Sequence, residues 1–221
     1  MEFSGLSPGT IITLVVGLAL APFVAVMVTS FTKIVVVLSL LRNALGLQQT
    51  PPNVVINGLA IILSIYVMYP VFIETYDHIG EQTQEMAKED MTVDTAIELI
   101  GYGKQPLKEF LLKHSSEEER AFFLNSIQRI LPEERRERVN KDDFIVVIPA
   151  FTVSELTSAF QIGFLIFLPF LVIDMIVANI LLALGMMMLS PTMVSLPFKL
   201  LLFVFISGWT KLIHGLVLTY V

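Results

Sequence analysis

Apolar residues fill four long stretches of this 221-residue chain, and few charges interrupt them. These stretches are residues 3–32, 54–73, 156–198 and 200–221. The third contains one charged residue, Asp174, and the fourth contains one, Lys211. A helix needs about 20 apolar residues to cross the hydrocarbon layer of a membrane. The pattern therefore predicts a membrane protein with about four hydrophobic helical segments.

The polar stretch between these segments has helical spacing. Ser116 and Glu119 fit a capping box, in which the serine side chain accepts a hydrogen bond from the amide three residues later. Apolar residues follow at helical intervals, and Pro132 marks the end of that helix. Pro106 is well placed to begin another helix, and Gly101 to end an earlier one. A small helical domain is predicted.

We expect an all-α, membrane-associated fold in three regions. Residues 1–73 and 148–221 each form a hydrophobic helical pair, and residues 74–147 form a small helical insert outside the cytoplasm. Proline removes a backbone donor and kinks or ends a helix, so several apolar helices are expected to bend. The prolines concerned are Pro22, Pro70 and Pro169.

The distribution of charge predicts how the chain is oriented. Residues 74–143 hold 17 acidic and 10 basic side chains, whereas the rest of the chain has a net charge of +1. The short links between paired apolar segments contain Arg42 and Lys199 and no acidic residue. Lys and Arg favour cytoplasmic loops. Both links are therefore expected to face the cytoplasm, and the acidic insert to face outward.

Several polar side chains lie within apolar sequence, where they are costly and normally face other protein. We expect Asp174 to form a buried ion pair with Lys33, Lys199 or Lys211, and a proton relay is the alternative. Ser154, Glu155, Ser158 and Gln161 form a polar stripe that is expected to hold helices together. The residues assigned to buried contacts and assembly are Lys33, Arg42, Glu155, Ser158, Gln161, Asp174, Lys199 and Lys211.

Motifs for catalysis, metal binding and nucleic-acid binding are missing. His78, His114 and His214 are scattered, without a second ligand at metal-site spacing. The chain has no cysteine, nucleophile elbow or phosphate-binding loop. Residues 101–103 (GYG) lack the Thr-Val of a potassium filter and are expected to form a helix-ending turn. Basic residues in 133–138 alternate with acids, which is typical of a solvated helix. We expect no enzyme activity, cofactor or nucleic acid.

Three long motifs resemble a known family. They are RNALGLQQTPPN at residues 42–53, PAFTVSELTSAFQIGF at residues 149–164 and LALGMMMLSP at residues 182–191. All three closely resemble the FliP/SctR family, the core subunit of the type III secretion export gate in flagella and injectisomes. The injectisome branch is favoured, because the first apolar segment begins almost at Met1 whereas flagellar members commonly have a cleaved signal peptide.

The resemblance implies a place in a larger assembly. Family members form a homopentamer with a small two-helix subunit (SctS/FliQ-like) and an SctT/FliR-like subunit, in a pore-enclosing cone at the bacterial inner membrane. The further partners implied are SctU/FlhB-like and SctV/FlhA-like export subunits, the inner rod, membrane lipid and unfolded secreted proteins. The hydrophobic helices are then expected to be tilted hairpins that pack against neighbouring subunits, with the insert in the periplasm.

The methionines in LGMMMLSP have two interpretations. Methionine packs well in irregular apolar surroundings, so Met186, Met187 and Met188 could simply fill a core. The resemblance instead implies a loop, bracketed by Gly185 and Pro191, that forms a gasket around an export pore. A hypothesis of a different class is a small-ion or proton channel that uses Asp174.

Overall fold

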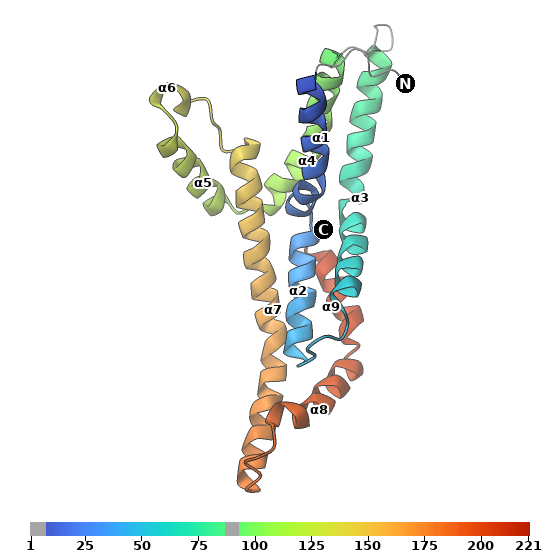
Figure 1. Ribbon diagram of the computed structural model, residues 1–221, viewed down its shortest axis with the longest axis vertical. Helices are drawn as coiled ribbons and strands as arrows, with labels where there is room; N and C mark the ends of the chain where they lie inside the picture. The colour runs from blue at the N-terminus through green and yellow to red at the C-terminus, as the bar shows by residue number, and fades with distance from the viewer. Residues whose placement is uncertain (1–7, 87–92) are drawn as a thin grey trace.

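The structure, a computed structural model, describes residues 8–86 and 93–221, and within these ranges it contains helices and no β-strand. The helices are α1 (Pro8–Met27), α2 (Phe31–Ala44), α3 (Asn53–Met86), α4 (Val93–His114), α5 (Glu117–Ile130), α6 (Glu133–Arg136), α7 (Phe144–Ala183), α8 (Pro191–Phe205) and α9 (Gly208–Leu218). The molecule is elongated, with α5 and α6 near one end and the α7–α8 loop at the other (Figure 1).

The long helix α7 is the axis on which the other helices pack. Its 40 residues correspond to a length of about 60 Å, and Pro149 and Pro169 lie within it without ending it. Helices α2, α4, α5 and α8 all pack against α7 (Figure 1). Residues that are far apart in the sequence are therefore brought together along one helix.

Within the described part of the chain, two helices are long and apolar enough to span a membrane, over residues Asn53–Gly80 and Phe144–Ala183. Two pairs of consecutive helices, each bent at a short break, would add two further spans if each pair is counted as one span. These pairs are residues Val15–Met27 with Phe31–Ala44, and Pro191–Phe205 with Gly208–Leu218. The predicted all-α membrane fold is confirmed. Because α3 continues to Met86 and α7 begins at Phe144, the boundaries predicted at 73/74 and 147/148 fall within helices, and the three-region division stays a prediction.

The polar insert folds partly as predicted. The Ser116 side chain accepts a hydrogen bond from the Glu119 amide at 3.1 Å, and α5 ends at Ile130, before Pro132. The predicted helix end at Gly101 and helix start at Pro106 are wrong, as is the helix-ending turn at residues 101–103, because α4 continues through all of them.

Packing explains why α4 is continuous. A Cβ atom at Gly103 would lie 3.2 Å from the Cδ1 atom of Ile79, so the glycine permits close contact with α3. Phe110 and Leu111, farther along α4, are buried in a cluster with Phe151 of α7. These contacts outweigh the local preference of glycine and proline for helix ends, because burial of an apolar face provides most of a helix's stability.

Close approach of α2 and α7 depends on one glycine. A Cβ atom at Gly163 would overlap the side chain of Leu40, with the Leu40 Cγ only 3.2 Å away. Overpacking of this kind typically costs about 1–3 kcal/mol. Gly163 therefore sets the distance between the two helices that pack most extensively.

We expect Gly163→Val to lower the thermal stability of the purified protein in detergent, by about 1–3 kcal/mol of unfolding free energy. Gly58→Val is the matched control, since a Cβ atom at Gly58 meets no atom within 4 Å. Both variants are measured by fluorescence-detected thermal unfolding. Equal losses of thermal stability would show that the close α2–α7 contact at Gly163 does not contribute specifically to stability.

Candidate functional site: a methionine loop and two buried ion pairs

The loop of residues 184–190 joins α7 to α8, and its two ends are fixed by local chemistry. Gly185 has a φ of +73°, a conformation that glycine adopts without strain. The Gly185 and Met186 amides donate to the carbonyls of Leu182 (3.0 Å) and Leu181 (2.9 Å), which is a Schellman motif. Pro191 then occupies the first turn of α8, where its missing N–H costs nothing.

The three methionines are exposed on this loop. The exposed fractions of Met186, Met187 and Met188 are 46%, 80% and 100%. They therefore do not fill the core of this chain. An exposed apolar group of this kind typically marks a surface for interaction with other molecules.

Asp174 pairs with Lys199, one of the three partners that the sequence allows. The Lys199 Nζ lies 2.6 Å from the Asp174 Oδ2 and also donates to the carbonyl of Ala44 at 3.2 Å. The Ser195 hydroxyl donates to the Asp174 Oδ1 at 2.5 Å. This cluster connects α7, α8 and the end of α2, on the helices that hold the methionine loop.

Lys33 pairs with Glu155 instead of Asp174. The Lys33 Nζ lies 2.9 Å from the Glu155 Oε1, and both side chains are buried. The Tyr220 hydroxyl donates to the Glu155 Oε2, and the Lys33 Nζ lies 4.0 Å from the centre of the Tyr220 ring. This second cluster joins α2 and α7 to the C-terminus. The sequence offered no signal for Tyr220, because 65 residues separate it from Glu155.

His114, at the end of α4, packs against the same tyrosine. Its ring centre lies 5.0 Å from that of Tyr220 and 4.7 Å from that of Phe110. Burial, followed by the charges of Lys33 and Lys113, lowers the pKa of His114 to about 4. The imidazole is therefore neutral at physiological pH, and no sequence pattern had indicated a structural role for this histidine.

The remaining residues of the predicted polar set do not form one network. Arg42 Nη1 donates to the Asn53 Oδ1 at 2.6 Å and to the Pro51 carbonyl at 3.3 Å, which fixes the link after α2. Ser154 Oγ accepts from the Ser116 amide at 2.9 Å and so ties the insert to α7. Ser158 is half-buried, whereas Gln161 and Lys211 are exposed. Among the described residues, no three metal-ligating side chains lie together.

Comparison with known proteins identifies close relatives. Residues 14–216 match the FliP family. The chain is 50% identical over 211 residues to the hypersensitivity response secretion protein HrcR of Ralstonia nicotianae, covering 96% of each chain. It is 51% identical over 203 residues to Yop proteins translocation protein R of Yersinia pestis (92% of each). It is 43% identical over 214 residues to virulence protein YscR of Salmonella typhimurium (97% of each).

We expect Asp174→Ala to destabilise the protein strongly, because it leaves the buried Lys199 ammonium without its carboxylate. Removal of one partner from a buried pair typically costs about 3–5 kcal/mol. The exchange variant Asp174→Lys with Lys199→Asp should recover part of the thermal stability measured in detergent. An exchange variant less stable than Asp174→Ala would argue that the pair is not the source of the loss.

The protein should lose stability as the pH falls from about 6.5 to about 4, in part because of His114. Its pKa is lower in the folded chain than its ordinary value of 6.5, so over this range the unfolded chain binds the proton that the folded chain excludes. The variant His114→Phe keeps a ring against Tyr220 but cannot titrate, so its unfolding midpoint should depend less on pH. His78→Gln, at an exposed histidine, is the control, and an identical pH dependence in His114→Phe and wild type would contradict the assignment.

Proposed function

The chain belongs to the FliP family, and we propose that it lines the pore through which a type III secretion apparatus exports unfolded proteins. Its relatives are secretion and translocation proteins of the SctR branch, so the chain is a component of the secretion apparatus in a bacterial membrane. The pore, its seal and the proteins that pass through it are the subject of the proposal.

The exposure of Met186–Met188 is the observation that supports this proposal most directly. These side chains project from a loop at one end of the molecule, where equivalent loops of neighbouring copies could meet. Unbranched thioether side chains adapt to many shapes, and an apolar constriction can exclude water and ions. A ring of such loops would allow an unfolded chain to slide through and would close when the chain has left.

The Asp174–Lys199 ion pair gives the loop a firm base, and the Lys33–Glu155 pair fixes α7 farther from the loop. The Asp174–Lys199 pair holds α7 to α8 on the two sides of the loop, and the Lys33–Glu155 pair holds α7 to α2. A seal requires the loop to stay in place while substrate moves past it. Helices α7 and α8 can then stay fixed while only the methionine side chains adapt to the passing substrate.

The surface of α7 supports assembly with other subunits. Gln161 is exposed on this apolar helix, and a polar side chain at membrane depth is expected to face other protein. We propose a homopentamer that also binds SctS/FliQ-like and SctT/FliR-like subunits, and that contacts SctU/FlhB-like and SctV/FlhA-like export subunits. The insert would face the periplasm and the inner rod.

Asp174 is better suited to holding helices together than to conducting ions or protons. A small-ion or proton channel would need this carboxylate to be accessible, but both of its oxygens are bonded, to Lys199 and Ser195. The family is a structural component of the export apparatus, and we propose that this chain performs no catalytic step. Energy for export would come from an ATPase and the proton gradient.

We expect replacement of Met186–Met188 by three glycines to give a complex that assembles but leaks ions, because the apolar barrier is removed. Ion conductance of the purified complex in planar bilayers and secretion in cells are the two measurements. Replacement by three leucines keeps the barrier apolar and should leave conductance low. Met193→Ala, at an exposed methionine in α8, is the control outside the loop.

An assembled glycine variant with unchanged conductance would overturn the gasket. A resting current in the wild-type complex that Asp174→Asn abolishes, with the methionines intact and assembly preserved, would instead support an ion path at Asp174. The two proposals are thus separated by the same recording.

A further inference from the structure

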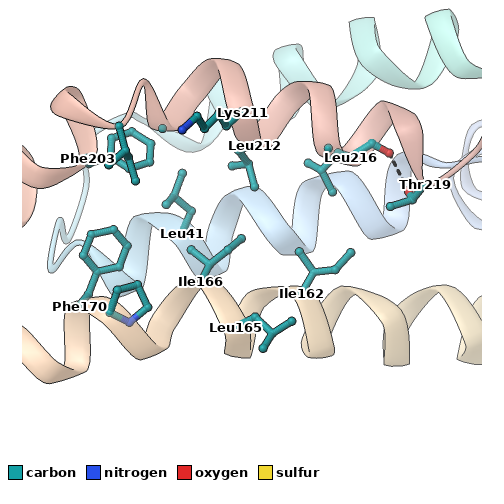
Figure 2. A pocket seen from close by; sticks show the side chains of 14 residues that line it. Leu41, Ile162, Leu165, Ile166, Phe170, Phe203, Lys211, Leu212, Leu216 and Thr219 are labelled. Carbon is teal, nitrogen blue, oxygen red and sulfur yellow. Dashed lines mark hydrogen bonds between the residues drawn. The ribbon is translucent and has the colours of Figure 1, made fainter.

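An apolar groove of about 460 Å³ lies between α2, α7 and the α8–α9 bend. Ile162 and Ile166 of α7 face Leu41 of α2 and Leu212 and Leu216 of α9 across it (Figure 2). Lys211, Gly215 and Thr219 also line it. Helix α7 and the α8–α9 pair are candidate membrane spans, so hydrocarbon or protein must fill this groove, because water in it would find almost no polar partner.

Lys211 is the one charged residue in the lining. It is exposed, and no ion pair or hydrogen bond joins its side chain to another of the described residues. The other three basic residues outside residues 74–143 all have partners: Lys33 and Lys199 are in ion pairs and Arg42 is hydrogen-bonded. An unpaired cation on an apolar membrane helix requires an anion or the interface. Outside residues 74–143, Lys211 is therefore the basic side chain of the described residues that has no protein partner.

The position of Lys211 within the groove defines the shape of a ligand. Figure 2 places Lys211 near Phe203 at one end of the groove and Thr219 at the other. The eight residues of helical rise from Lys211 to Thr219 correspond to about 12 Å. The Thr219 hydroxyl donates to the Leu216 carbonyl at 2.7 Å, so this end offers no free donor. A ligand with an anionic head at Lys211 and an apolar tail along α9 matches both ends.

We propose that the groove binds one acyl chain of an anionic phospholipid, whose phosphate contacts Lys211. The groove volume falls within the range of about 300–1000 Å³ typical of small-molecule sites. A flexible lysine stem can follow the apolar wall while its ammonium reaches the headgroup.

The proposal requires only that these helices lie in a membrane, so it does not depend on the methionine gasket. Binding of lipid here would hold α9 against α2 and α7, and would make the stability of the complex depend on the membrane's anionic lipid content.

The test uses the full-length chain in its complex with the other export subunits, stripped of lipid in detergent. Phosphatidylglycerol and phosphatidylcholine with identical acyl chains are added separately, and retained lipid is counted by native mass spectrometry. Wild type should retain more phosphatidylglycerol, by about fivefold, as expected for one lysine near a phosphate. Lys211→Gln should retain the two lipids equally.

A second variant tests the groove without changing charge. Gly215 lines the groove, and a Cβ atom there meets no atom within 4 Å, so Gly215→Leu should occupy the space and reduce retention of both lipids. The controls are Gly58→Leu, another open glycine, and Lys141→Gln, at an exposed lysine of the insert. The proposal is overturned if wild type retains neither lipid, if it retains both equally, or if Lys211→Gln keeps the preference.

Discussion

A charge placed in apolar surroundings costs several kcal/mol unless it has a partner, and this constraint shapes the protein. Outside the polar insert, the described part of the chain has two acidic residues, Glu155 and Asp174, and both lie on α7. Each meets a lysine from another helix, Lys33 of α2 or Lys199 of α8. The apolar helices therefore have few arrangements open to them, since most alternatives would leave a buried charge unpaired.

These pairings connect α7 to two different parts of the chain. Through Tyr220, the Lys33–Glu155 pair holds the C-terminus, which also contacts His114 of the insert. The Asp174–Lys199 pair joins α7 to α8, closer in the sequence to the methionine loop. Rigid helices with an adaptable loop at one end are a suitable design for a seal that must admit chains of varied sequence. In the proposed gasket, the exposed methionines act only when other copies surround them.

Local chemistry made several features predictable from the sequence. The Ser116 cap follows from short-range hydrogen bonding. The need of Asp174 for a cationic partner follows from the cost of a buried charge. The role of Tyr220 could not be predicted, because its contact with Glu155 depends on how α7 meets the C-terminus. The continuity of α4 through Gly101 and Pro106 was missed for a similar reason, since packing on α3 and α7 outweighed local preference.

The central claim is that the methionine loops of several copies meet around one passage. The chain has no cysteine, so Met187→Cys introduces a single thiol, and mild oxidation of assembled complexes in membranes followed by non-reducing electrophoresis reads out its neighbours directly. The account predicts disulfide-linked dimers of this chain for Met187→Cys and none for Phe122→Cys, at an exposed residue of α5. Assembled complexes in which Met187→Cys gives no such dimer, even with a short bismaleimide linker, would contradict it.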